Sequence, residues 1–154
     1  MHIPKTSSQV EVSKEWRIAI VRSKFNSDLT QSLKDRCFQE LIQNGVDSAQ
    51  IDVIEVPGAF EIPLACKKLL DTKSYHCLIA LGVVIKGATN HFDMIMNEVS
   101  RKIMDLMVEY STPIIYEVIG CYTQQDAIAR TSDDEYNKGA EAAKTALEIL
   151  SATF

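Results

Sequence analysis

The segment from Cys77 to Ile85 constrains the fold more than any other part of the chain. It reads Cys-Leu-Ile-Ala-Leu-Gly-Val-Val-Ile, which is apolar on both faces and has the length of a single strand. A strand of this kind is buried on both sides, as happens in parallel sheets that are covered by helices. We therefore expect a parallel sheet sandwiched between helices.

Three other apolar runs indicate strands, and helical patterns follow each strand. Strands are expected over 17–22, 51–56 and 114–119, and helices from Asn26 or Ser27 to Asn44, after Pro57-Gly58, over 91–110, over 124–130 as a short turn, and over 137–150. Strand and helix thus alternate four times. This alternation predicts a single open α/β sheet of four parallel strands flanked by helices.

The length of the chain indicates how many domains it forms, and its net charge limits the kinds of partner it can bind. The 154 residues are 46% hydrophobic and carry a net charge of -5, which suits one globular domain over 15–154. Residues 1–14 are polar and are expected to form an N-terminal arm. The negative charge argues against nucleic acid or an anionic membrane as the main partner, although a local cationic site for a small anion is compatible with it.

The cysteines and histidines show no metal-binding pattern. Cys37, Cys66, Cys77 and Cys121 are widely scattered in apolar surroundings, so we expect buried free thiols. The N-terminus lacks the apolar core of a signal peptide, and no apolar run is long enough to span a bilayer. We therefore expect a cytoplasmic protein without a metal.

Ligands of open parallel sheets bind outside the carboxyl ends of the strands. The segments expected there are Phe25-Asn26, 57–61, 86–91 and the region after Ile119. Phe25-Asn26 is compatible with a core aromatic and a helix cap, or with an aromatic platform and an amide that contact a flat ring. Glu61 either complements a helix dipole or accepts hydrogen bonds from a polyol or amine.

The segment Lys86-Gly87-Ala88-Thr89-Asn90-His91 favours an anion site with a base beside it. Helix N-termini expose backbone N–H groups that attract anions, and histidine transfers protons near neutral pH. The segment matches neither the Walker A pattern nor the dinucleotide-binding glycine pattern. Arg130 can grip a phosphate through two N–H groups, whereas the acidic run 132–135 is expected to be a solvated loop.

Four segments occur in order with spacings that, taken jointly, are highly specific. They are Phe-Asn at 25–26, Pro-Gly-Ala-Phe-Glu-Ile-Pro at 57–63, Gly-Val-Val-Ile-Lys-Gly-Ala-Thr-Asn-His-Phe at 82–92, and Arg130 with Asn-Lys-Gly at 137–139. From about Arg17 to Leu150 the chain resembles the 6,7-dimethyl-8-ribityllumazine synthase family, the riboflavin synthase beta-chain family.

The resemblance implies a transferase that acts in the penultimate step of riboflavin biosynthesis. The family condenses 5-amino-6-(D-ribitylamino)uracil with 3,4-dihydroxy-2-butanone 4-phosphate, and it releases phosphate and water without a metal or redox cofactor. The implied fold is a flavodoxin-like three-layer sandwich. The implied assembly is a homopentamer or a multiple of it, with sites between subunits and riboflavin synthase as a candidate partner.

The resemblance also implies residue roles. Phe25 would stack on the pyrimidine, Asn26 would hydrogen-bond its edge, and His91 would transfer protons. The other contacts of the same chain would be Gly58, Ala59, Phe60 and Glu61 at the ring and ribityl chain, Val84, Ile85 and Lys86 at the ring, and Gly87, Ala88 and Thr89 at the phosphate. A neighbouring subunit would supply Tyr116 over the ring, Arg130 at the phosphate, Lys138 at the pyrimidine and Glu141 to orient His91.

The chain departs from the family pattern at three places. Lys86 stands where arginine is frequent, Tyr116 where phenylalanine is frequent, and 131–136 replaces a glycine-containing segment, with Asp134 in place of a lysine. Phosphate affinity and the choice among pentamer, decamer and capsid are left open. The same residues are also compatible with two alternatives to the active enzyme: a flavin- or lumazine-binding protein, and a shell-forming protein on the same scaffold.

Overall fold

The computed structural model describes residues 10–152. Residues 1–9 of the expected arm lie outside the described residues. The later residues of that arm contact the domain, because Val10 and Val12 pack against one of its hydrophobic clusters, as Trp16 of the domain does. The side-chain amide of Gln50 donates to the carbonyl oxygens of Ser13 and Trp16, at 2.9 Å each, and holds this segment in place.

Four parallel strands form one sheet in the order β2-β1-β3-β4. The elements in chain order are β1 Ile18–Ser23, α1 Ser27–Gln43, η1 Ser48–Gln50, β2 Ile51–Val56, η2 Ala59–Glu61, α2 Ile62–Asp71, β3 Cys77–Ile85, α3 His91–Tyr110, β4 Ile114–Cys121, α4 Gln124–Thr131 and α5 Lys138–Ser151. The predicted α/β sandwich with a four-stranded parallel sheet is confirmed, and its arrangement is flavodoxin-like.

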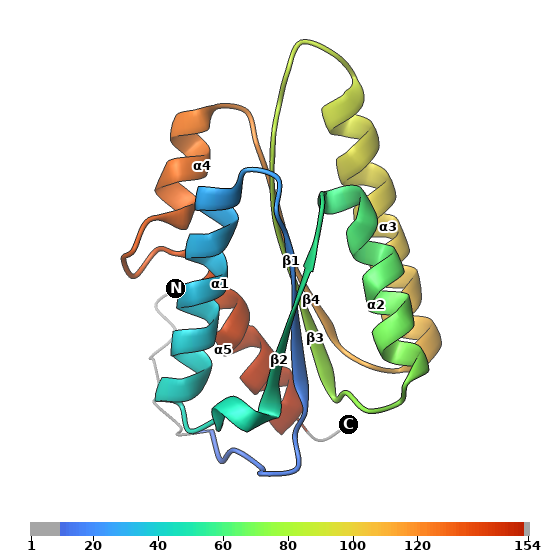
Figure 1. The fold of residues 1–154 in the computed structure, drawn as a ribbon, viewed down its shortest axis with the longest axis vertical. Helices are drawn as coiled ribbons and strands as arrows, with labels where there is room; N and C mark the ends of the chain where they lie inside the picture. Colours follow the sequence, from blue (N-terminus) through green and yellow to red (C-terminus); the bar gives the residue numbers. More distant parts are fainter. Residues whose placement is uncertain (1–9, 153–154) are drawn as a thin grey trace, which may run out of the picture.

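The helices form two layers, one on each face of the sheet. Figure 1 shows α1, α4 and α5 on one side and α2 and α3 on the other. Each layer encloses its own cluster of buried side chains, one built around Ile18, Ile20 and Leu33, and the other around Val21, Ile62 and Ile103. The strand order reverses between β1 and β3, since β1 pairs with both β2 and β3. This switch point is where an open α/β sheet binds ligands at its carboxyl edge.

Most predicted boundaries agree with the structure. β2, β3 and α3 begin and end where the sequence pattern placed them, whereas β4 continues two residues further, to Cys121, instead of ending at Ile119. The last helix begins at Lys138, because Asn137 is its cap and accepts the N–H of Gly139 at 2.8 Å. Gly45 follows α1 with φ 101°, as expected of a glycine that ends a helix.

Two small-residue positions let α5 approach α1 and α3 approach β4. A Cβ atom at Gly139 would lie 2.0 Å from the backbone oxygen of Leu33, and one at Gly120 would lie 2.9 Å from the ring of Phe92. Both glycines therefore set packing distances. The first fixes the start of α5, which carries Lys138, and the second fixes β4 against the start of α3.

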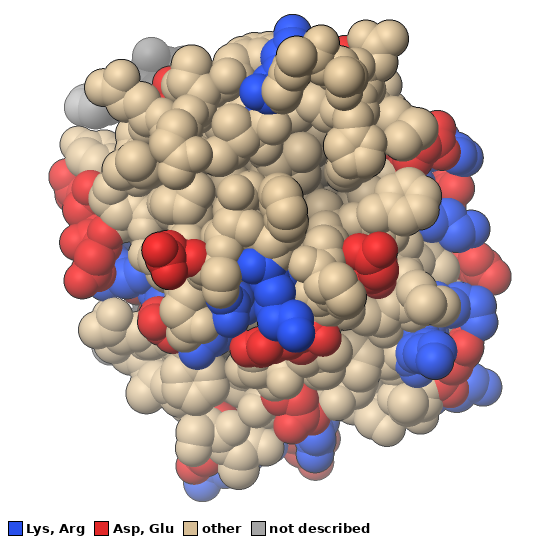
Figure 2. Space-filling model, turned by 45° about the horizontal axis from the view of Figure 1, so that its top comes forward, with Lys and Arg blue, Asp and Glu red and all other residues tan. Residues whose placement is uncertain are grey.

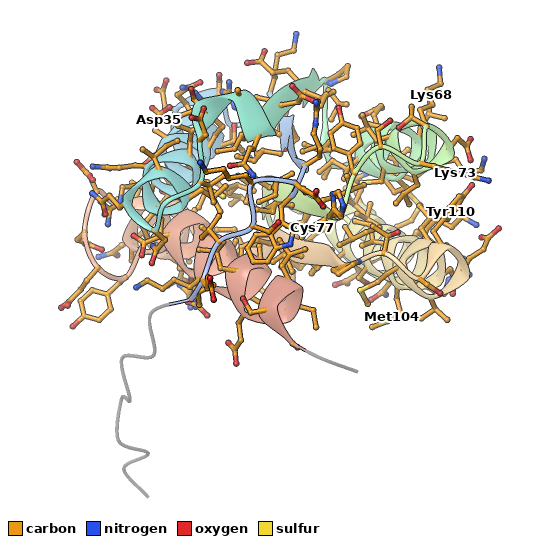
Figure 3. The ribbon with its side chains drawn as sticks, turned by 90° about the horizontal axis from the view of Figure 1, so that it is seen from below. Asp35, Lys68, Lys73, Cys77, Met104 and Tyr110 are labelled. Carbon is orange, nitrogen blue, oxygen red and sulfur yellow. The ribbon has the colours of Figure 1, made fainter. Side chains whose placement is uncertain are left out.

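The amino ends of the strands form the opposite edge of the sheet. Figure 3 shows this edge, with Cys77 between the two helix layers and Tyr110 on the side of α2 and α3. Here Arg17 forms an ion pair of 2.7 Å with Asp52, which also accepts from the hydroxyl of Tyr75 at 2.7 Å. None of the described helices is long and apolar enough to cross a membrane.

Candidate functional site

A cavity of about 570 Å³ opens at the carboxyl ends of β1, β2 and β3. Figure 2, in which this end is turned toward the viewer, shows that the upper half of the view is mostly uncharged. The cavity is lined by Phe25, Gly58, Ala59, Phe60, Glu61, Val84, Ile85, Gly87, Thr89, His91, Phe92, Met94 and Ile95. We call these residues the inner set. The sequence predicted ten of them as substrate-contacting or catalytic residues, and the fold brings these ten together.

The turn after β1 presents Phe25 to the cavity. Its ring is 71% exposed, so Phe25 is not the core aromatic that one interpretation expected. Asn26 precedes α1 with φ 57°, and its side chain caps no backbone N–H of that helix, which corrects the expectation of a side-chain cap. Its amide nitrogen instead donates to the carbonyl of Val83 at 2.8 Å. Asn26 thus ties the turn after β1 to β3, and it is not part of the cavity lining.

The segment after β2 turns through a short 3₁₀ helix, η2, before α2 begins. The carboxylate of Glu61 accepts the backbone N–H of Gly58 at 3.0 Å, so it closes this turn from within. Pro63 then lies in the first turn of α2, where the missing N–H costs nothing. This contact is compatible with Glu61 as a partner of the helix dipole and with Glu61 as an acceptor for a substrate. The side chain of Glu61 also lines the cavity.

The loop from β3 to α3 carries the predicted anion site. Gly87, Ala88, Thr89 and His91 are exposed, and the hydroxyl oxygen of Thr89 accepts the backbone N–H of His91 at 3.4 Å. The side chain of the N-cap residue Asn90 makes no capping hydrogen bond, which leaves the next N–H groups of the first turn of α3 available to an anion. Ala88 and Lys86 are absent from the cavity lining.

Lys86 is held beside β4 and not over the cavity. Its backbone N–H donates to the carbonyl of Cys121 at 2.8 Å, and its Nζ lies 5.3 Å from the centre of the Tyr122 ring. The ring of Tyr122 in turn packs 5.9 Å from that of Phe92. The ammonium group of Lys86 therefore makes a cation–π interaction with Tyr122, whose ring packs against Phe92.

Sequence reasoning missed three residues of the cavity wall. Phe92, Met94 and Ile95 line it from the first turn of α3. Ile95 also packs against the core cluster under α2 and α3. Phe92 is only 8% exposed, so it belongs to the core as well as to the cavity wall. Met94 is half exposed and had no periodic signal. The only available signal was proximity to His91 at the start of a helix.

The four site residues expected from a neighbouring subunit lie outside the cavity of their own chain, as Asn26, Lys86 and Ala88 do. The four are Tyr116 on β4, Arg130 on α4, and Lys138 and Glu141 on α5, which we call the outer set. Arg130 lies beside Asp126, at 3.9 Å, and Lys138 pairs with Glu141 at 2.9 Å. Tyr116 is partly buried, and its hydroxyl finds no hydrogen-bond partner among the described residues. Burial raises the pKa of Tyr116 to about 12.

The acidic segment between α4 and α5 is exposed, as expected, but it is anchored. Arg36 of α1 reaches the carboxylate of Asp133 at 3.5 Å and donates to the carbonyl of Asp134 at 3.2 Å. The carboxylate of Asp134 accepts the N–H of Tyr136 at 2.8 Å. The segment is therefore held against α1, and it does not line the cavity.

A partly buried carboxylate lies under the outer set. The pKa of Glu117 is raised to about 7, chiefly by burial and secondly by the charge of Glu141, while the charge of Lys138 opposes the shift. The four cysteines are free and buried, and desolvation raises the pKa of the thiols of Cys66 and Cys77 to about 12 each. Within residues 10–152 no cluster of three His, Cys, Asp or Glu side chains is placed to hold a metal ion.

The cavity combines two aromatic walls, a carboxylate and an imidazole. Phe25 and Phe60 present exposed rings, Glu61 supplies acceptor oxygens, and His91 stands at the start of α3. This arrangement suits a flat polar ring at one end and an anion near a proton-transferring group at the other. No lysine or arginine side chain is among its lining residues, so a bound anion would meet backbone N–H groups, the Thr89 hydroxyl and the His91 imidazole there.

Two comparisons with known proteins agree on the family. The sequence model described as 6,7-dimethyl-8-ribityllumazine synthase matches residues 15–153. A protein named 6,7-dimethyl-8-ribityllumazine synthase, from Desulfotalea psychrophila, is 39% identical over 133 residues, which are 86% of this chain and 86% of that protein.

Proposed function

Because the chain belongs to the 6,7-dimethyl-8-ribityllumazine synthase family, it is a transferase of riboflavin biosynthesis, and we propose that its reaction takes place in the cavity at the carboxyl ends of β1, β2 and β3. The reaction condenses 5-amino-6-(D-ribitylamino)uracil with 3,4-dihydroxy-2-butanone 4-phosphate to 6,7-dimethyl-8-ribityllumazine. The observation that carries the proposal is the convergence of ten predicted residues from three separate segments on one cavity.

The pyrimidine binds at the aromatic end of the cavity. Phe25 stacks on its ring, and Phe60 and Glu61 contact the ring and ribityl chain. The exposed ring of Phe25 and the carboxylate of Glu61 at the cavity wall support this placement. Asn26 contributes by holding the turn, since its amide nitrogen is bonded to Val83. Its side-chain oxygen remains available as an acceptor for the ring edge.

The phosphate of the second substrate binds at the start of α3. The backbone N–H groups of Gly87, Ala88 and Thr89 and the positive end of the helix dipole attract it. Arg130 of a neighbouring subunit supplies the cationic side chain that the cavity of one chain lacks. A phosphate held in this way is stabilised as it leaves.

His91 transfers the protons of the condensation. An aryl amine of the pyrimidine attacks the ketone to give an imine, phosphate then leaves by elimination, and the second amine closes the ring. The imidazole stands beside the proposed phosphate site, because His91 is the first residue of α3. Orientation of the two substrates supplies much of the remaining acceleration.

The site is completed by a neighbouring subunit in a homopentamer or a multiple of it. The exposed Arg130 and the partly exposed Lys138 support this, because neither lines the cavity of its own chain. Exposed apolar side chains next to the cavity, such as Phe60 at 59% and Leu64 at 60%, support a covered surface there. The buried free thiols fit the expected cytoplasmic location, and riboflavin synthase remains the candidate protein partner.

An activity measurement on the purified protein tests the proposal. Both substrates are mixed with and without protein, and lumazine formation is followed by its absorbance. We expect a rate well above the uncatalysed reaction, and Phe25→Ala should raise the KM for the pyrimidine substrate. Product formation that is equal with and without protein would contradict the proposal and favour the binding or shell-forming alternatives.

A further inference from the structure

Arg22 is the most completely bonded charged side chain in the described part of the structure. It lies at the carboxyl end of β1 and is only 4% exposed. Its Nε donates to Thr30 Oγ1 at 3.1 Å, and its Nη1 donates to Gln31 Oε1 at 2.7 Å and Glu55 Oε1 at 3.2 Å. Its Nη2 donates to the carbonyl oxygen of Ser27 at 2.9 Å and to Ser27 Oγ at 2.8 Å. These contacts engage every N–H direction of the guanidinium group.

The contacts of Arg22 converge on the turn that presents Phe25. Ser27, which accepts two of its hydrogen bonds, is the first residue of α1 and follows Asn26. Asn26 itself has φ 57°, a left-handed conformation that persists only where the surroundings determine it. The backbone of the turn is also tied to β2, because Lys24 N–H donates to Val56 O at 2.8 Å and Phe25 N–H to Pro57 O at 2.9 Å.

We propose that Arg22 is a positioning residue for the pyrimidine substrate: its guanidinium fixes the start of α1 against β1 and β2 and thereby sets where the Phe25 ring stands in the cavity. This inference rests on the proposed function, in which Phe25 stacks on the pyrimidine. Arg22 is not among the residues that line the cavity, so its effect on the substrate would pass through the turn that carries Phe25.

Stability alone is a weak reason for an arginine at this position. Its only carboxylate partner, Glu55, is 48% exposed and contacts a single nitrogen, so most of the cost of burying the charge is offset by neutral acceptors. An apolar side chain of similar length would avoid that cost. An apolar side chain could not hold the surrounding residues by hydrogen bonds. The planar guanidinium group donates five hydrogen bonds in fixed directions and so orients its neighbours.

The test compares Arg22→Met with Arg17→Met. Arg17 joins the same two strands at the opposite edge of the sheet, through its ion pair with Asp52, so it controls for the loss of an arginine. For each variant the KM is measured separately for the two substrates, and the melting temperature is recorded. We expect Arg22→Met to raise the KM for the pyrimidine about tenfold and to leave the KM for the butanone phosphate within about twofold. Arg17→Met should change neither KM.

Two milder variants keep the inference testable if Arg22→Met does not fold. Arg22→Lys retains the charge with fewer donors, and Ser27→Ala removes one acceptor; each should raise the same KM by a smaller factor. A lower melting temperature with both KM values unchanged in these variants would overturn the positioning role. Phe25→Ala is measured in parallel. If it raises the pyrimidine KM while the Arg22 variants do not, only this inference fails, whereas an unchanged KM for Phe25→Ala contradicts the proposed site itself.

Discussion

The inner and outer sets differ in where they lie within one chain: the inner set lines the cavity, and the outer set lies outside it. The inner set comes from the ends of β1, β2 and β3 and from the start of α3, and it encloses a cavity within a single chain. The outer set comes from β4, α4 and α5, and its Arg130, Lys138 and Glu141 lie on helices of the opposite layer from α2 and α3 (Figure 1). Its charged side chains engage neighbours on their own helices.

This difference indicates a division of labour. The inner set offers aromatic surface, a carboxylate, an imidazole and helix N–H groups, but no cationic side chain. The outer set holds the missing cations, Arg130 and Lys138, on an exposed surface. The proposed reaction, which starts from a phosphate ester, would use both sets.

Removal of the imidazole should cost the most. His91→Ala should lower kcat by about 100-fold to 1,000-fold, since positioned acid–base groups contribute effects of this size. Both KM values should change little, because His91 is assigned to proton transfer and not to binding. Steady-state kinetics measures this, and a raised KM with an unchanged kcat would move His91 from catalysis to binding.

Removal of the outer-set arginine should instead weaken binding. Arg130→Ala should raise the KM for the butanone phosphate by about tenfold to 100-fold, as expected for the loss of charge-assisted hydrogen bonds. Lys144→Ala is a matched control, since Lys144 is an exposed α5 cation that faces Glu40. An unchanged KM for this substrate in Arg130→Ala would show that its assigned role is wrong.

The smallest effect concerns Glu117, beneath Lys138 and Glu141. Its folded-state pKa is raised from 4.5 to about 7, mainly by burial. The folded protein therefore holds a proton that the unfolded chain releases. The stabilisation is fully present below pH 4.5 and is lost as the pH rises through about 7.

Glu117→Gln should abolish this pH dependence. Between pH 5 and pH 8 the wild type should lose on the order of 1–2 kcal/mol more unfolding free energy than the variant. Melting temperatures of both proteins across this range measure the difference. Parallel curves would show that Glu117 titrates in the folded protein at its ordinary pKa.

The fold was largely predictable because its signals are local. The apolar run 77–85 and the alternation of strand and helix defined the sheet, and the segments at the strand ends located the cavity. The details that failed depend on distant contacts. Asn26 is a residue type that often caps helices, but its side-chain amide donates a hydrogen bond to the carbonyl of Val83, 57 positions away in the sequence. Phe92 and Ile95 repeat with a helical period that does not distinguish core from cavity wall.

The most direct test of the divided site mixes two impaired variants. His91→Ala lacks the inner-set base and Arg130→Ala lacks the outer-set cation, so each homo-oligomer has only defective sites. After joint unfolding and reassembly, a random mixture of equal amounts should recover about a quarter of the wild-type activity, because about one interface in four then joins two intact halves. Activity that stays at the average of the two separate variants, with mixed oligomers verified by mass spectrometry, would contradict a site shared between subunits.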